Sequence, residues 1–174
     1  MEQPTERVSE DSFPDINVDT GLGIVNITVF DKSNFEDDRL LRPIYYGAAA
    51  IVAFVFAVDD PASFGSIEDL WWSECLEIRP GVPTVVIGCK RDTREGPPAA
   101  DSSRKFVTSQ EGIALANRIG AWRYFECSAK TYTGMEILLE SIGDISWEIY
   151  HQKRKKRRTP LFEFSAVIPC EDSA

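Results

Sequence analysis

Residues 50–58 read Ala-Ile-Val-Ala-Phe-Val-Phe-Ala-Val, an uninterrupted apolar run rich in Val and Phe. A strand that is covered on both faces needs such a run, because both rows of its side chains are buried, as in a parallel sheet. The next residues, Asp60-Pro61, are suited to a helix start, with an N-cap carboxylate followed by proline in the first turn. This stretch therefore predicts a buried strand followed by a helix, the repeating unit of an α/β fold.

The same pattern continues toward the C-terminus. The helix is expected to span 61–77 and to end at Pro80-Gly81, and residues 82–88 read as the next buried strand. The apolar side chains that this helix is expected to bury in part are Phe64, Ile67, Leu70, Trp71 and Cys75. A loop rich in Pro, Gly and Ser follows at 93–103.

Two further helices and a short strand complete this region. Thr108-Ser109-Gln110-Glu111 has the pattern of a capping box and predicts a helix to about Ile119. Residues 122–126 predict a short strand. Residues 134–150 predict a long helix, since apolar residues recur at spacings of three and four.

A β-hairpin is expected before the first helix. Residues 16–18 and 24–30 are two short apolar segments that flank Asp19-Thr20-Gly21-Leu22-Gly23, a segment typical of a turn. Together these elements predict an α/β fold with a mostly parallel sheet, helices on both faces, right-handed crossovers and one hairpin.

Composition excludes several classes of protein. Of the 174 residues, 43% are hydrophobic and 27% are charged, which argues against wholesale disorder and low-complexity scaffolds. The longest uncharged, mostly apolar stretch, residues 44–58, is too short to cross a bilayer, and residues 1–19 lack the pattern of a secretory signal. The four cysteines are widely spaced and accompanied by a single histidine, His151, which argues against a zinc site or a disulfide framework and favours a reducing cytosol.

The net charge of −9 is unevenly distributed. Six of the 19 basic residues lie at 153–158, and the rest of the chain carries 13 basic against 28 acidic residues. An acidic body repels nucleic acid, so we expect no nucleic-acid partner. Any contact with a polyanion is expected to be local to residues 153–158.

Polar residues follow three of the predicted strands, at the edge of the sheet where ligands of α/β proteins bind. Asp31 follows Phe30, Cys89-Lys90-Arg91-Asp92 follows Gly88, and Ser128-Ala129-Lys130 comes directly after Glu126-Cys127, where the strand predicted at 122–126 ends. Each motif alone is common in solvated loops. Their order and spacing together are more specific.

With these motifs, residues 15–150 resemble the Rho family of small GTPases. The matching segments are Val29-Phe30-Asp31 with Glu36-Asp37, Leu41-Arg42-Pro43, Pro61-Ala62-Ser63-Phe64, Pro80-Gly81-Val82-Pro83, Lys90-x-Asp92-x-Arg94 and Tyr124-Phe125-Glu126-Cys127-Ser128-Ala129-Lys130. The resemblance implies an incomplete small-GTPase sheet of the P-loop NTPase type, with GTP or GDP and Mg²⁺ as cofactors and with Rho effectors or regulators as partners of a monomer. It divides the chain into a disordered segment 1–14, a Rho-like domain 15–150, and a basic then acidic tail 151–174.

The resemblance also implies a guanine-binding site. The family's carboxylate at the position of Asp92 accepts from the guanine ring nitrogen and amine, a donor pair that adenine lacks. The lysine at Lys90 lies along the base, the N–H at Ala129 donates to the guanine oxygen, and Ser128 and Lys130 brace the loop. Asp31 matches the acidic residue that orients Mg²⁺, usually through a water.

Several positions depart from the family. Cys89 stands where Asn or Thr usually tethers the base-binding loop, which weakens that pocket. Asn34 and Phe35 replace the glycine that meets the terminal phosphate and the glutamine that orients water. We therefore expect no catalytic residue and no hydrolysis.

The phosphate-binding loop is the largest departure. No G-x-x-x-x-G-K-[ST] motif occurs in the 174 residues, and the family's first strand and first helix are missing with it. That strand lies between those predicted at 24–30 and 50–58, so their edges must pair directly, accept a strand from elsewhere, or stay exposed. An incomplete chain and a true nucleotide-free relative both explain the gap, and the cost of a sheet lacking its centre favours the first.

The tail carries its own predictions. Lys153, Arg154, Lys155, Lys156, Arg157 and Arg158 follow the last predicted helix and are typical of reversible membrane attachment, of nuclear import or of a solvated helix end. Cys170 is fifth from the end, whereas a prenylation box needs it fourth. We expect a cytoplasmic protein, peripheral to the inner plasma membrane, with the nucleus as the alternative.

Two functions follow from the resemblance. The first is a Rho-like guanine-nucleotide switch that has lost hydrolysis and in which nucleotide orders residues 31–46. The alternative is a non-enzymatic pseudoGTPase scaffold or decoy that binds Rho partners or membrane.

Overall fold

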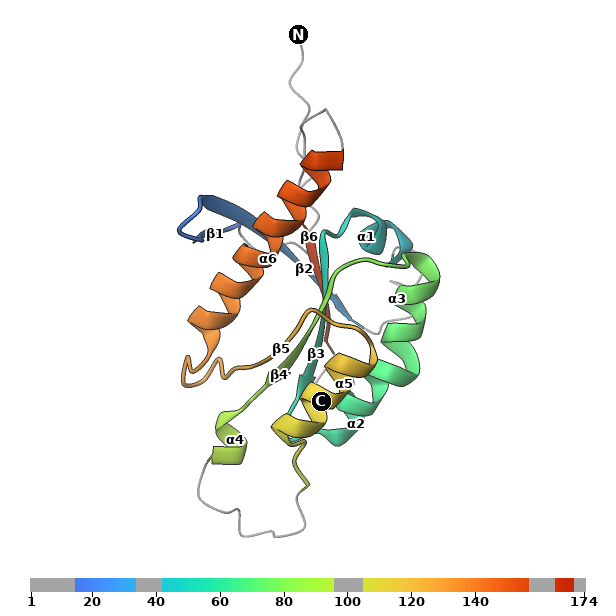
Figure 1. Ribbon diagram of the computed structural model, residues 1–174. Helices are drawn as coiled ribbons and strands as arrows, with labels where there is room; N and C mark the ends of the chain where they lie inside the picture. The colour runs from blue at the N-terminus through green and yellow to red at the C-terminus, as the bar shows by residue number, and fades with distance from the viewer. Residues whose placement is uncertain (1–14, 34–41, 96–104, 157–164, 171–174) are drawn as a thin grey trace.

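A six-stranded sheet forms the centre of the structure, with its strands in the order β1-β2-β6-β3-β4-β5 (Figure 1). The computed structural model describes residues 15–33, 42–95, 105–156 and 165–170. The strands are β1 (Ile16–Asp19), β2 (Ile24–Ser33), β3 (Ile51–Ala57), β4 (Thr84–Cys89), β5 (Arg123–Glu126) and β6 (Ser165–Cys170). The β1–β2 hairpin is antiparallel, and the ladders among the other described strands are parallel. The predicted α/β class is confirmed, whereas the disorder predicted for residues 1–14 lies outside the described residues.

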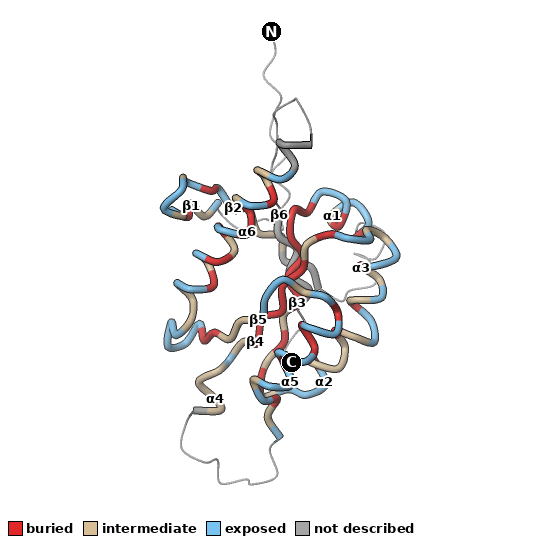
Figure 2. The backbone as a smooth tube through the Cα atoms, viewed as in Figure 1, coloured by how far each residue is buried: buried red, intermediate tan, exposed pale blue. Residues whose placement is uncertain are grey.

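Helices cover both faces of this sheet (Figure 1). They are α1 (Arg42–Ala48), α2 (Pro61–Ser66), η2 (Ile67–Trp72), α3 (Ser73–Ile78), α4 (Asp92–Glu95), α5 (Ser109–Arg118) and α6 (Met135–Lys156). Phe54 of β3 packs with Leu115 of α5 on one face, and Val85 of β4 packs with Ile145 of α6 on the other. Buried residues accordingly follow the central strands (Figure 2). The continuous apolar run of β3 is explained, because its alternate side chains enter two separate cores.

Strand β6 occupies the position between β2 and β3 and is parallel to both. Its register with β2 runs from Thr28↔Ser165 to Ser33↔Cys170. Of the three outcomes predicted for the edges of the flanking strands, the second is found, since they accept a strand from elsewhere in the chain. The sequence alone had placed this segment in the C-terminal tail. Pro169 makes it an unusual central strand, because proline removes a ladder donor.

The pairing with β6 also corrects the predicted end of β2. We expected that strand to stop at Phe30 and Asp31 to lie after it. Residues 31–33 instead continue the strand, because they pair with Ile168–Cys170. Asp31 therefore lies within β2 rather than beyond its end.

The helix predicted at 61–77 is present as the consecutive segments α2, η2 and α3, with one misplaced side chain. Ile67, Trp71 and Cys75 are buried as predicted, but Leu70 is 41% exposed. Segment η2 is a π-helical turn, which holds more residues per turn than an α-helix and therefore rotates the apolar stripe. This local widening moves Leu70 off the buried face.

Both predicted helix caps are confirmed. Asp60 Oδ1 accepts from the backbone N–H of Ala62 at 3.0 Å, at the start of α2. Thr108 and Glu111 form the reciprocal capping box at the start of α5, with Thr108 N–H donating to Glu111 Oε2 at 2.7 Å. These contacts set where both helices begin.

Helix α6 extends six residues past the expected end at Tyr150 and includes residues 153–156. Part of the basic run is thus helical rather than a segment that follows the helix. Arg157 and Arg158 lie outside the described residues.

Candidate functional site

Two loops lie against each other at the carboxyl ends of β4 and β5. Residues 90–94 follow β4 and residues 127–134 follow β5, and each loop carries one of the motifs identified in the sequence. Cys127 N–H donates to the Gly88 carbonyl at 2.9 Å, and Arg91 N–H donates to the Cys127 carbonyl at 3.1 Å. These bonds continue the β4–β5 ladder past the strands and hold the two motifs together.

Asp92, the first residue of α4, has a carboxylate held between these loops. The Ser128 hydroxyl donates to Asp92 Oδ1 at 2.5 Å, and Lys130 Nζ lies 3.8 Å from Oδ2. Ser128 is fully buried whereas the Lys130 side chain is 83% exposed, so the carboxylate is braced from the interior and open toward solvent on the lysine side. A carboxylate fixed in this way can accept from two adjacent N–H donors of a ligand.

Lys90 adopts a left-handed backbone conformation with φ +59°, which is uncommon for a residue with a side chain. Its carbonyl accepts from Thr93 N–H at 2.9 Å and from Thr93 Oγ1 at 2.7 Å. Its Nζ lies 3.9 Å from Asp59 Oδ1. The conformation of the loop is therefore set by contacts of both the backbone and the side chain of Lys90.

The second loop has a fixed path of its own. Ser128 N–H donates to the Thr133 carbonyl at 2.9 Å, and Thr131 N–H donates to Ser128 Oγ at 3.2 Å. Gly134 closes the loop with φ +76°, and a Cβ at this position would lie 2.3 Å from the Glu126 carbonyl oxygen. Only glycine fits there, and Ala129 is left exposed on the loop.

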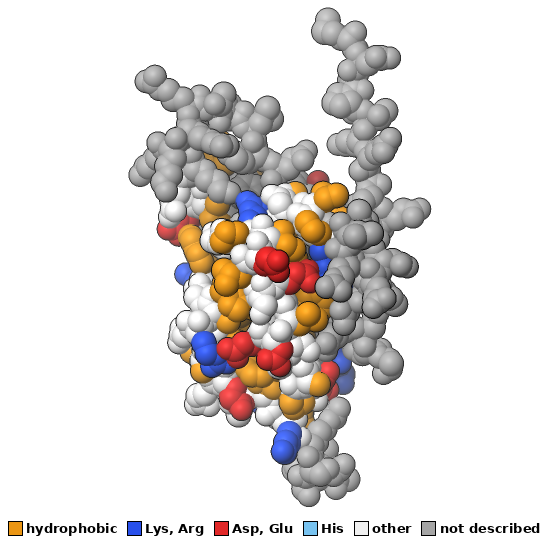
Figure 3. All heavy atoms as spheres, turned by 90° about the vertical axis from the view of Figure 1, so that its right-hand side faces the viewer, with side chains coloured by type: hydrophobic (Ala, Val, Ile, Leu, Met, Phe, Trp, Pro, Cys, Tyr) orange, Lys and Arg blue, Asp and Glu red, His pale blue; other side chains and the backbone are white. Residues whose placement is uncertain are grey.

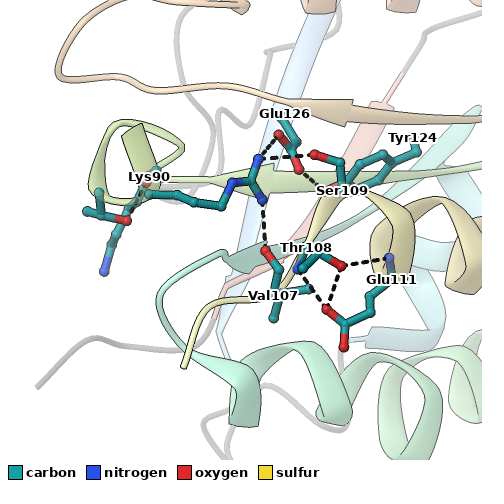
Figure 4. A network of polar contacts seen from close by, with 9 residues as sticks. Lys90, Val107, Thr108, Ser109, Glu111, Tyr124 and Glu126 are labelled. Atoms are coloured by element: carbon teal, nitrogen blue, oxygen red, sulfur yellow. Dashed lines mark hydrogen bonds and ion pairs between the residues drawn. The ribbon is translucent and has the colours of Figure 1, made fainter. Parts of the chain in front are cut away.

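A polar network supports both loops from the side of α5 (Figure 4). Arg94 donates to the Val107 carbonyl at 2.8 Å and to Ser109 Oγ at 3.1 Å, and it also forms an ion pair with Glu126. Tyr124 OH donates to the other Glu126 oxygen at 2.6 Å. Burial alone raises the pKa of Glu126, but hydrogen bonds from Arg94, Tyr124 and Ser109 outweigh it and hold that pKa below its ordinary value. Arg94 and Glu126 belong to the motifs identified in the sequence, which gave neither of them a role. The only sequence signal for them is their position two residues from Asp92 and from Ser128.

Comparison with known proteins identifies the family. Residues 6–146 match the profile of the Ras family. The chain is 34% identical over 155 residues to the GTP-binding protein RHO1 of Candida albicans, covering 87% of this chain and 77% of that protein. It is 36% identical over 138 residues to GTP-binding protein rho1 of Schizosaccharomyces pombe (77% and 67%), and 34% identical over 163 residues to rho2 of the same yeast (90% and 80%). The chain belongs to the Ras family, as a Rho-type small GTPase.

Members of this family generally bind GTP or GDP with Mg²⁺ and interact with protein effectors and regulators. The structure brings together the five residues expected to recognise guanine, which we call the base corner: Lys90, Asp92, Ser128, Ala129 and Lys130. Ser128 and Lys130 each contact the Asp92 carboxylate. Binding of guanine by these residues stays a prediction.

The structure separates Asp31, the residue expected near Mg²⁺, from the base corner. It lies on β2, with β6 and β3 between that strand and β4. Three strand spacings amount to about 14 Å. The Asp31 side chain, Asn34 and Phe35 lie outside the described part, and the searched side chains hold no group of three or more potential metal ligands.

The basic run belongs in part to α6, as noted above, and its role at a membrane or in nuclear import stays a prediction. Among the described residues, every helix is too short or too polar to cross a bilayer.

Proposed function

We propose that this Rho-type protein recognises guanine through its base corner, does not hydrolyse GTP, and acts through contacts with protein partners. One observation carries the proposal: β6 fills the position between β2 and β3. In the family, that position belongs to the strand that leads into the phosphate-binding loop. A strand carrying such a loop has a place in this sheet only if β6 leaves it.

The end of β6 offers little to a phosphate group. Cys170 pairs with Ser33 at this edge, and the sequence continues with Glu171-Asp172 rather than with glycines. A phosphate loop supplies several backbone N–H groups and a lysine, which form strong charge-assisted hydrogen bonds. A nucleotide held at Asp92 would have to cross the ends of β3 and β6 to approach Asp31, without those contacts.

Hydrolysis has a second obstacle. Phe35 stands at the position of the family's glutamine, whose amide orients the attacking water. A phenyl ring has no group that can donate to or accept from water in this way. This supports the loss of turnover independently of the phosphate loop.

A surface suited to protein partners remains on the side of α1, α3 and α5, where apolar side chains lie among acidic and basic ones (Figure 3). Exposed apolar residues on helices packed against this face of the sheet include Leu70, Leu76 and Ile113. A protein interface has an apolar centre surrounded by a polar rim. This pattern supports contacts with proteins.

Titration calorimetry with guanosine, GDP and GTP, each with Mg²⁺, tests the proposal. Because the base corner provides the contacts, we expect the three ligands to bind with similar and weak affinity. We expect the wild-type protein to bind adenosine no better than the Asp92→Asn variant binds it. Asp69→Asn, at an exposed position of η2, is the matched control. Purified protein that carries stoichiometric GDP, or that binds GTP far more tightly than guanosine, would show that a phosphate site exists.

A second candidate is a nucleotide-free scaffold. It is favoured by the contacts of Ser128 and Lys130, which engage both oxygens of Asp92 and would compete with a base for them. Absence of guanosine binding, together with direct binding of a purified Rho regulator, would favour the scaffold over guanine recognition.

A further inference from the structure

Two thiols lie in contact directly beneath the base corner. Cys89 is the last residue of β4 and Cys127 follows β5, and their Sγ atoms are 3.9 Å apart. Both side chains belong to the apolar cluster under α6, so they point to the same face of the sheet. Cys127 is 3% exposed, while Cys89 is half-buried.

The backbone around these thiols is suitable for a disulfide. Gly88 and Glu126 are register partners in the parallel β4–β5 ladder, and the two cysteines are the next residues along. Neighbouring strands lie about 4.8 Å apart, within the Cα separations of about 4.4–6.8 Å that disulfides span. A bond of about 2.05 Å needs the two sulfurs to approach by a little under 2 Å.

We propose that Cys89 and Cys127 are a redox modification site, which hydrogen peroxide oxidises to a reversible disulfide next to the base corner. In the first step a Cys127 thiolate attacks the peroxide, so that an S–O bond forms, the O–O bond breaks and hydroxide leaves. Cys89 sulfur then attacks the sulfenic sulfur, so that the S–S bond forms, the S–O bond breaks and water leaves. Two thiols lose two electrons and two protons, and the peroxide is reduced to water.

The local electrostatics favour this order of steps. A hydrogen bond between the two thiols, in which either sulfur can be the donor, lowers the pKa of Cys127 despite its burial. The thiolate is the reactive form of cysteine. Burial instead raises the pKa of Cys75 to about 11, so the remaining cysteine of the described core is expected to be inert.

The disulfide is expected to change the base corner. Lys90 directly follows Cys89, and Ser128, which holds Asp92, directly follows Cys127. Drawing the sulfurs together displaces one or both loops. Loss of one hydrogen bond to a charged group corresponds to about a tenfold or greater loss of affinity. This consequence rests on the proposed function, whereas formation of the disulfide does not.

The test uses the full chain, treated with hydrogen peroxide, blocked with iodoacetamide and digested without reduction. Mass spectrometry is expected to find the peptides of Cys89 and Cys127 linked, and dithiothreitol to separate them. Cys89→Ser should abolish the link, and Cys170→Ser, the matched control, should retain it. Separate oxidation of the two thiols to sulfinic acids, without a link, overturns the proposal.

Guanosine titration of the reduced and oxidised protein measures the consequence. Binding about tenfold weaker after oxidation, restored by dithiothreitol, supports it. Equal affinity in both states overturns the effect on the base corner. If the disulfide is mapped but the protein binds guanosine in neither state, the modification site is supported and guanine recognition is refuted. Failure of the disulfide proposal and failure of the proposed function are therefore distinguishable.

Discussion

Glu126 shows how a single side chain supports the two loops of the base corner. Its carboxylate accepts from Arg94 and Tyr124. Because Arg94 also donates to Ser109, these contacts connect β5 to α4 and to the start of α5. The side chain is 9% exposed, so these contacts lie largely out of solvent. The sequence placed Glu126 on a strand, but nothing in the spacing of the chain indicates that Arg94 would reach it.

Glu126→Gln tests this contact through its pH dependence. The folded protein holds the pKa of Glu126 below its unfolded value of about 4.3, so the carboxylate stabilises the fold above that pH and loses this effect as pH falls through the folded pKa. We expect the variant to lose about 1.5–3 kcal/mol of unfolding free energy at pH 7, the range for hydrogen bonds to charged groups. Urea titrations at pH 7 and at the acid limit of folding should show the difference from wild type shrinking on acidification. A difference that stays constant with pH would contradict the ionic contribution of this contact.

Helix α1 is an element that the sequence did not predict. It spans only Arg42–Ala48, and a helix this short is marginal without tertiary contacts. Arg42 forms an ion pair with Glu74 of α3 at 2.8 Å, and Arg79 donates to the carbonyls of Tyr46 and Gly47 at 2.7 Å. Burial and the nearby Glu74 raise the pKa of Tyr46. These partners lie about 30 residues away in sequence, so no local pattern could reveal the helix.

Arg42→Ala tests how far this ion pair fixes α1. Arg42 is 5% exposed and its guanidinium lies 5.0 Å from the centre of the Trp71 ring. Removing one partner of a buried pair leaves a buried charge, so we expect a loss of about 3–5 kcal/mol in urea unfolding. Arg118→Ala is the matched control, because its pair with Glu68 on α5 and η2 is exposed and should contribute less than about 1 kcal/mol. Equal effects of the two variants would refute the anchoring of α1.

Elements with a local signal were predicted well. Asp60-Pro61, the Thr108–Glu111 capping box and the apolar run of β3 fix their elements by contacts within a few residues. The predicted burial of Leu70 was wrong because a simple helical periodicity does not reveal the π-helical turn.

Thr108→Ala tests the strongest of these local signals. Loss of the cap should lower the unfolding free energy by about 1 kcal/mol, since Glu111 N–H loses its acceptor. Gln110→Ala, at an exposed position of the same turn, should change it by much less. Urea unfolding followed by circular dichroism measures both, and an unchanged midpoint for Thr108→Ala would show that the cap is not needed.

At the scale of the whole molecule, the sequence indicated that the sheet lacks a central strand but not which segment takes its place. The two strands that lack a neighbour were identified, and the three outcomes for their edges followed from the cost of open edges. The segment that fills the gap could not be identified, because residues 165–170 are short, contain Pro169 and lie beyond a charged run. Its position depends on pairing with β2, more than 130 residues away. The sequence did indicate that the two motifs of the base corner lie close together, since they follow neighbouring strands, and the family resemblance supplied the role expected of each residue.

The register of β6 provides the most direct measurement of the central claim, that this strand completes the sheet where a phosphate-loop strand would otherwise lie. Ser33→Cys places a thiol opposite native Cys170, at a strand spacing that a disulfide can bridge. Thr28→Cys is the matched control, because Thr28 pairs with Ser165, about 16 Å along the strand from Cys170. Mild oxidation of the full-length Ser33→Cys protein should link positions 33 and 170 within one molecule. The Thr28→Cys protein should form no link between positions 28 and 170. Ser33→Cys combined with Cys170→Ser should form no link at position 33. A Ser33→Cys protein that forms no such link, or forms it only between two chains, would contradict the account.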